Sequence, residues 1–343
     1  MPQCDPRGVE HEQAESGVYR ADWTYVSGIL AVAETRLLTD DEFLDLLRQP
    51  DLKAALQRLK QVETYVHQPE GVPDAEVKRA LEQEYVRIAC ELARQSPDPT
   101  VCKMMLASYI FAEVRARVRQ ALSPEHAAEP PGLITDEQID ALSGGSIDGR
   151  LDFDAMADEV RTHIEQADDP AAAMDLLIDR EELVYMLEQA RRIGSDFITQ
   201  WTEEEGLMKA AVTIVRAQLA GESEDRLINV FLAPPLEYDW LIRLVREDFD
   251  RMDNVLMERL EATEGELITV SRKTLGEIAR RTDDRVTHRL TDAKRVAFGP
   301  ERVFGYLWAL RTENLNLRLI SETFVVQADR DETRTKLRRS YIG

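Results

Sequence analysis

The pattern of apolar residues predicts one long buried helix over residues 298–324. Its apolar side chains recur at three-, four- and seven-residue spacing and form two adjacent stripes, Val303, Leu307, Leu310, Leu317 and Phe324 in the first and Phe304, Trp308, Leu315 and Leu319 in the second. The segment Gly299-Pro300-Glu301 supplies a turn, a first-turn proline and an acid at the positive end of the helix dipole. Two neighbouring stripes indicate a helix that is covered on more than one side.

Three polar residues, Glu313, Asn316 and Arg318, lie inside this apolar helix. Burying a charge without a partner costs several kcal/mol, so each of them needs a partner. Glu313 and Arg318 are five positions apart, which places them on different sides of a helix with about 3.6 residues per turn. We therefore predict that their partners come from other helices and that they lock helices together. A ligand or partner site is the alternative.

The same spacing predicts further helices over residues 19–38, 75–95 and 100–122, and a shorter one that starts after Thr39. Thr39 and Glu42 have the spacing of a capping box, which marks a helix start. No stretch alternates apolar and polar residues for long, so strands are not predicted. The expected fold class is all-α.

Three segments of the chain are alike, because each joins two apolar residues to a threonine: Leu37-Leu38-Thr39, Leu133-Ile134-Thr135 and Leu267-Ile268-Thr269. Each is followed by a long helix that carries an arginine among apolar residues, and these arginines are Arg115, Arg216 and Arg318. Such repetition suggests an internal triplication in which the three arginines take equivalent places.

The domain boundaries are expected near residues 125 and 225, the first of them at the segment Glu129-Pro130-Pro131-Gly132. The predicted organisation is a disordered tail over 1–16 and helical units over 17–125, 126–225 and 226–343. If the three units close a ring, the first helix (19–38) must pack beside the last (303–324), since each end would otherwise leave an apolar face uncovered.

This closure also needs a polar contact between the first and last helices. Glu34 is the acid nearest to the end of the first helix, and Arg311 and Arg318 are the cations of the last helix that would face it. We therefore predict a partly buried ion pair between Glu34 and one of these two arginines.

The charge of the chain narrows its choice of partners. The 343 residues include 43 Lys and Arg and 65 Asp and Glu, a formal net charge of −22. Residues 270–343 hold 16 basic and 10 acidic side chains, so they carry +6 and the remainder carries −28. An acidic body repels nucleic acid and anionic lipid, and we expect neither as a direct partner. The basic part suits an acidic protein, although solvated helix faces give the same count.

Composition and motifs exclude several other classes. No apolar run approaches the ~20 residues that span a bilayer, and residues 1–20 lack the apolar region of a signal peptide, so we expect a cytoplasmic protein without a membrane span. The odd cysteine count and the lack of CxxC spacing indicate neither disulfides nor zinc. There is no phosphate-binding loop and no HExxH, so no catalytic residue, cofactor or metal is expected.

Three parts of the chain carry a family resemblance, and one of them is the middle segment with Thr213, Arg216 and Ala217. Glu34-Thr35-Arg36-Leu37-Leu38 matches a Glu-Ser-Arg-Leu-Leu start, and Phe298-Gly299-Pro300-Glu301, Tyr306-Leu307, Glu313, Asn316 and Arg318 match a C-terminal signature, with a closing segment at Leu337-Arg338 and Tyr341. In these residues the chain resembles the C subunit of archaeal and bacterial V-type (A-type) ATPases, a family related to subunit d of the eukaryotic vacuolar enzyme.

The resemblance implies a funnel-like socket of three pseudo-symmetric helical units between the central shaft and the membrane proteolipid ring of a rotary motor. Such a socket transmits torque during ATP synthesis or ion transport, and it has no enzymatic activity and no cofactor. The implied partners are the shaft subunits and the ring, with the protein held at the membrane through the complex and monomeric when isolated. The candidate structural or interface residues are Glu34, Arg115, Arg216, Arg311, Glu313, Asn316 and Arg318.

Two other classes remain open on the residues alone. An unrelated all-α acidic adaptor would bind a partner helix in an exposed apolar groove, and an all-α enzyme would use some of the scattered carboxylates. The socket should instead show a central recess lined by three equivalent helices.

Overall fold

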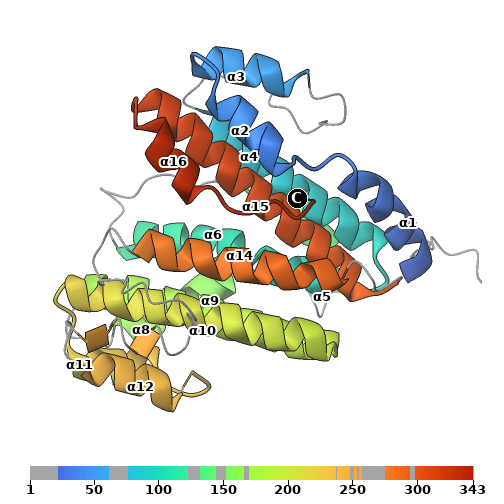
Figure 1. Ribbon diagram of the computed structural model, residues 1–343. Helices are drawn as coiled ribbons and strands as arrows, with labels where there is room; N and C mark the ends of the chain where they lie inside the picture. Colours follow the sequence, from blue (N-terminus) through green and yellow to red (C-terminus); the bar gives the residue numbers. More distant parts are fainter. Residues whose placement is uncertain are drawn as a thin grey trace, which may run out of the picture.

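The computed structural model describes residues 22–61, 76–122, 132–143, 152–165, 170–236, 238–247, 251–252, 255–256, 275–293 and 298–342. These residues form helices and no β-strand, so the predicted all-α class is confirmed (Figure 1). In the same part of the chain, no helix has both the length and the apolar character needed to cross a membrane. The predicted tail over 1–16 and the boundary near residue 125 lie outside the described residues.

The bounds of the helices in chain order are α1 (Trp23–Glu34), α2 (Asp40–Leu47), α3 (Leu52–Leu59), α4 (Val77–Gln95), α5 (Thr100–Met105), α6 (Ala107–Leu122), α7 (Asp136–Ser143), α8 (Phe153–Glu165), α9 (Pro170–Ile193), α10 (Asp196–Leu219), α11 (Glu224–Arg226), the π-helix η3 (Leu227–Phe231), α12 (Asp239–Arg246), α14 (Leu275–Ala293), α15 (Pro300–Val325) and α16 (Arg330–Lys336). The boundary expected near residue 225 falls inside α11. The division into three units stays a prediction.

The long apolar pattern forms α15, which begins where the sequence predicts. Pro300 occupies the first turn, and Gly299 before it has a φ of 141°, a conformation that glycine adopts far more readily than other residues. Val303, Leu307 and Leu310 are all buried. Helices α1, α4, α5 and α14 pack around α15, and Figure 1 shows α4 behind it and α14 below it. Burial on several sides follows from the two apolar stripes.

Two of the three predicted helix starts have the same cap. Thr39 Oγ1 accepts a hydrogen bond from Glu42 N (3.3 Å), and the Glu42 carboxylate accepts one from Thr39 N (2.8 Å). At the start of α7, Gln138 N donates to Thr135 Oγ1 (3.3 Å) and Thr135 N donates to the Gln138 side chain (2.8 Å). The third start, over 267–269, lies outside the described residues. The repeated sequence signal therefore corresponds to a repeated cap at both described positions.

Two predicted helices differ from the observed ones. The helix expected over 100–122 is divided at Leu106, whose φ of −95° and ψ of 2° end α5 before α6 begins. The helix expected over 19–38 ends at Glu34, because the following residues turn into the core and the N–H of Leu38 donates to a side chain of α15. In both cases tertiary contacts override the local pattern.

Three apolar clusters form the core of the described residues. The largest joins α1, α4, α5, α6, α7 and α8 to the first turns of α15 and parts of α9, α10 and α14. The second joins α9, α10, α12 and η3, and the third joins α2, α3 and α4 to the later turns of α15. Because α4, α9, α10, α14 and α15 each contribute to two clusters, the clusters are connected by continuous helices.

The first and last long helices pack together, which confirms the predicted contact between the ends of the chain. The predicted arginine is wrong: Arg302 Nη2 donates to Glu34 Oε2 at 2.9 Å, and these side chains are 10% and 16% exposed. Arg302 lies in the first turn of α15, opposite the end of α1. Arg311 and Arg318 lie further along α15 and contact α10 and α4 instead.

Replacing Glu34 with alanine should destabilise the fold by about 3 kcal/mol, because it removes one member of a largely buried ion pair. Replacing Arg318 with alanine is the matched control. The Arg318 side chain is 36% exposed and pairs with Glu82 at 3.5 Å, so its loss should cost less than about 1 kcal/mol. Urea unfolding of both variants measures the difference, and equal losses would contradict the assigned closure.

Candidate functional site

Glu313 is a buried carboxylate held by a backbone amide of a distant segment. Its side chain lies in the middle of α15, the residue is 3% exposed, and its Oε2 accepts a hydrogen bond of 2.6 Å from Leu38 N. Within the described structure its Oε1 has no hydrogen-bond partner. Burial raises the pKa of Glu313 to about 8, so the carboxyl holds a proton at neutral pH. The prediction that the partner of Glu313 comes from another helix is wrong: the partner is a backbone amide in the segment between α1 and α2.

A second buried glutamate, on α6, also accepts a hydrogen bond from the backbone amide of a distant segment. Sequence reasoning did not identify this residue. Glu113 is 4% exposed, and its Oε1 accepts a hydrogen bond of 2.8 Å from Leu133 N, just before α7. Each carboxylate thus binds the amide one or two residues before the threonine of a repeated helix start. The signal was present in the sequence, since Glu113 lies between the apolar residues Phe111 and Val114 as Glu313 lies in its own apolar helix.

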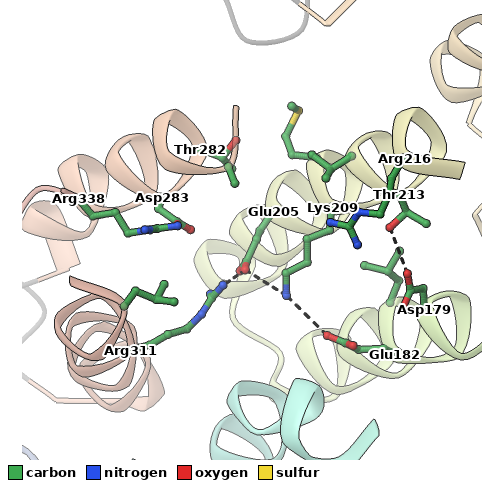
Figure 2. Close-up of a pocket in the computed structure, with 15 residues that line it drawn as sticks. Asp179, Glu182, Glu205, Lys209, Thr213, Arg216, Thr282, Asp283, Arg311 and Arg338 are labelled. Carbon is green, nitrogen blue, oxygen red and sulfur yellow. Dashed lines mark hydrogen bonds and ion pairs between the residues drawn. The ribbon is translucent and has the colours of Figure 1, made fainter. Parts of the chain in front are cut away.

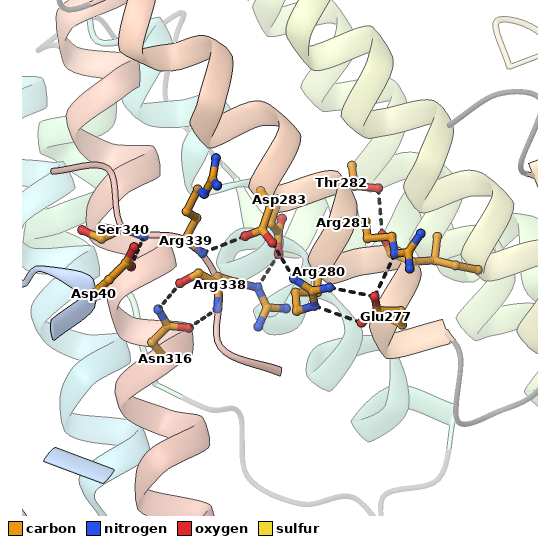
Figure 3. A network of polar contacts seen from close by, with 12 residues as sticks. Asp40, Glu277, Arg280, Arg281, Thr282, Asp283, Asn316, Arg338, Arg339 and Ser340 are labelled. Carbon is orange, nitrogen blue, oxygen red and sulfur yellow. Dashed lines mark hydrogen bonds and ion pairs between the residues drawn. The ribbon is translucent and has the colours of Figure 1, made fainter. Parts of the chain in front are cut away.

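Asn316 fixes the segment that follows α16. It is fully buried, its Nδ2 donates to Arg338 O (2.8 Å), and its Oδ1 accepts from Arg338 N (2.8 Å). Arg338 Nε then donates to Asp283 on α14 at 2.5 Å. Ser340 N donates to Asp40 on α2 at 2.7 Å, as Figure 3 shows. This segment therefore connects α15, α14 and α2. The partner of Asn316 is the backbone of a non-helical segment, whereas a side chain or backbone group of another helix was predicted.

The three arginines of the proposed triplication make different contacts. Arg115 on α6 pairs with Asp175 at 2.6 Å and Asp179 at 2.5 Å, both on α9. Arg318 on α15 pairs with a glutamate of α4 and with one of its own helix. Arg216 on α10 is exposed and makes no side-chain hydrogen bond or ion pair with the described residues. Their equivalence stays a prediction.

A pocket of about 310 Å³ lies between α9, α10, α14 and α15. Its polar lining, shown in Figure 2, is Asp179, Glu182, Glu205, Lys209, Thr213, Arg216, Thr282, Asp283, Arg311 and Arg338. Its apolar lining is Leu183, Met208, Val212, Ala279 and Leu315. Two predicted residues, Arg216 and Arg311, meet here, and Arg115 reaches the rim through Asp179. The lining comes from four helices and, at Arg338, from the segment after α16, and not from three equivalent helices as expected for a central recess.

Glu205 is at the centre of the contacts inside this pocket. It is 5% exposed, its Oε1 accepts a hydrogen bond of 2.8 Å from Arg311, and it lies 3.4 Å from Lys209 Nζ. Burial by itself raises the pKa of Glu205, but Lys209 and Arg311 outweigh burial and bring the pKa below its usual value. Glu205 is therefore ionised, and it ties α10 to α15.

The pocket is lined by paired charges and by apolar side chains. The acids of the pocket lie beside cations, and the described part of the chain contains no group of three or more His, Cys, Asp or Glu residues that could hold a metal. Apolar side chains form the rest of the wall. Such a surface suits contact with side chains of another protein.

A comparison with protein families gives one match. The model of the family described as ATP synthase (C/AC39) subunit matches residues 26–336. No curated protein matches the chain. The matched stretch begins inside α1 and ends with the last residue of α16, so it contains all seven predicted site residues and the contact between Glu34 and Arg302.

The stability of the protein should depend on pH through Glu313. Its pKa is 4.5 in the unfolded chain and about 8 when folded, so the folded state holds the proton more tightly. The contribution of this group is complete below pH 4.5 and is lost as the pH rises towards 8, by up to about 1.4 kcal/mol per pH unit. Glu313→Gln cannot ionise, so its urea unfolding curves from pH 5 to 8.5 should lack this loss. A wild-type slope in the variant would contradict the protonated state.

Replacing Asn316 with alanine should release the segment after α16, because both backbone groups of Arg338 lose their partner. We expect a loss of about 2 kcal/mol and faster hydrogen exchange at Arg338 N and Ser340 N. Asn314→Ala is the control, since Asn314 makes one hydrogen bond, to Leu81 O at 3.1 Å. Unchanged exchange in the Asn316 variant would show that other contacts hold the segment.

Proposed function

The chain belongs to the ATP synthase (C/AC39) subunit family, and from this premise we propose that it is a non-catalytic central-stalk subunit of a V/A-type rotary ATPase. In this role it is a socket that joins the central shaft to the membrane proteolipid ring and transmits torque between them. The single observation that carries the proposal is the family match, which extends over residues 26–336, from inside α1 to the end of α16. The match removes the alternative of an unrelated adaptor.

The contacts of α15 support the proposed role in transmitting mechanical force. A torque-transmitting subunit must resist separation of its helices, and α15 is tied near its start to Glu34 and in its middle to Leu38 N and to Glu205. Most of these groups are buried, where salt screens charges weakly and a polar contact is costly to break. The helix at the centre of the fold is thereby fixed to both α1 and α10.

The polar ties also support three units arranged in a cycle. Glu313 of the third predicted unit holds the start of α2 in the first, and Glu113 of the first holds the start of α7 in the second. Arg311 joins the third unit to the second through Glu205. The proposed units are 17–125, 126–225 and 226–343. They form a pseudo-symmetric funnel in which each unit is joined to the next by a polar contact.

The partners in this proposal are the shaft subunits and the proteolipid ring, with the protein attached to the membrane peripherally through them. The isolated chain is a monomer and hydrolyses no nucleotide. Two features support this: the sequence lacks a phosphate-binding loop, and the polar pocket is built for pairing side chains.

Affinity isolation from native membranes tests the proposed role. The full chain, tagged ahead of residue 1 so that the bound segment after α16 is untouched, should bring down both proteolipid and shaft subunits after mild detergent extraction. Membranes with the untagged chain are the control. Recovery of the tagged chain without either subunit would contradict the role, and so would ATP hydrolysis by the isolated chain at enzyme-like rates of about 1 per second or more.

A further inference from the structure

Arg216 differs from the other cations of the pocket between α9, α10, α14 and α15, because each of the others lies beside an acid. Lys209 lies within 3.8 Å of Glu182 and 3.4 Å of Glu205. Arg311 pairs with Glu205, and Arg338 pairs with an aspartate of α14. Arg216 also lines the pocket but has no acidic partner among the described residues, and Figure 2 shows no contact drawn to it.

The position of Arg216 makes this lack of a partner informative. Arg216 and Lys209 are two turns apart on the same face of α10, so two cations lie along one wall. Asp179, an acid of the same pocket, already binds Arg115 at 2.5 Å and accepts a hydrogen bond of 3.5 Å from Thr213. The protein carries 65 acidic side chains, yet none of the described ones is paired with Arg216. The wall can therefore accept an anion that the described residues do not supply.

The remaining lining of the pocket shows what kind of anion fits. Asp179, Glu182, Glu205 and Asp283 line the same space, and each already lies beside a cation. Among the described residues, Arg216 alone of the lining cations is left for an anion, and one guanidinium balances a single carboxylate better than a phosphate or a nucleotide with two or more negative charges. The apolar walls, which include Met208, Val212 and Leu315, favour an aliphatic or aromatic side chain over a hydrated ion. A single carboxylate on an otherwise apolar protein segment satisfies both conditions.

The size of the pocket is consistent with side chains and not with a whole helix. A volume of about 310 Å³ is at the lower end of the range for ligand pockets, ~300–1,000 Å³. A helix or loop of a partner would therefore lie across the opening and place a few side chains inside it. The guanidinium of Arg216 can donate two parallel hydrogen bonds to one carboxylate, which fixes the orientation of the partner.

We propose that this pocket is a docking site for the central shaft, in which Arg216 binds a carboxylate of a shaft subunit while Met208, Val212 and Leu315 contact apolar side chains beside it. The inference rests on the proposed function, because the shaft is one of the two partners named there. It adds the surface, the chemistry and the residue that recognise the shaft.

Charge reversal at Arg216 tests this site in the full chain. Arg216→Glu should lower the amount of shaft subunit recovered from native membranes by about tenfold or more, while the amount of proteolipid recovered stays at the wild-type level. Arg216→Lys, which keeps the charge, should recover shaft subunit to an intermediate level. Because Arg216 is exposed and unpaired in the described structure, both variants should unfold at the wild-type temperature.

The matched control is Arg246→Glu, which makes the same change of charge on α12, away from the pocket. Arg246 is 63% exposed and lies 3.3 Å from Glu224, so this variant should recover shaft and ring at wild-type levels. Raising the salt concentration during isolation should weaken shaft recovery in the wild type more than in Arg216→Glu, because the variant has already lost the ion pair.

The outcomes separate this inference from the proposed role. If the wild-type chain recovers neither shaft nor ring, the proposed role fails. If the wild type recovers both and Arg216→Glu does so equally, the role holds and the docking site is overturned. Equal losses of shaft in the Arg216→Glu and Arg246→Glu variants would also overturn it, since net charge alone would then explain the effect.

Discussion

The structure depends on one constraint, which is that the polar side chains inside α15 must find partners where water cannot reach them. A buried carboxyl or amide without a hydrogen bond costs free energy comparable to a sizeable part of the stability of a domain. Glu313 meets this requirement with the amide of Leu38, and Asn316 meets it with the backbone of Arg338. These partners come from opposite ends of the described chain. The requirement of one helix therefore brings the first and last segments onto the same scaffold.

Polar contacts and apolar packing act on different scales in this fold. The three apolar clusters hold neighbouring helices together without specifying their relative rotation, since hydrophobic contact is not directional. The ion pairs and amide contacts supply direction. Glu205, for example, lies between Arg311 of α15 and Lys209 of its own helix, and the pair with Arg311 ties α10 to α15 at one point along each helix. The proposed role in torque transmission would benefit from such directional contacts, because they resist sliding as well as separation.

The sequence predicted those features that depend on local spacing. The start of α15 at Pro300 and the capping box at Thr39 follow from a few adjacent residues, and both are confirmed. The all-α class follows from the absence of alternating patterns. Sequence reasoning also recognised that Glu313 and Asn316 needed distant partners, because burial of a polar residue can be read from the apolar residues around it.

What the sequence did not reveal depends on how helices meet in space. The choice of Arg302 over Arg311 as the partner of Glu34 is set by the point at which α1 crosses α15, and no local pattern encodes that point. The segment from Leu337 to Ile342, which binds α2, α14 and α15 at once, has a consequence for biosynthesis. The ribosome synthesises this segment after every helix that the segment contacts. Those helices therefore lack these contacts until the segment has been made. A chain that stops at Lys336 would contain every described helix and would still lack the hydrogen bonds by which this segment joins α2, α14 and α15.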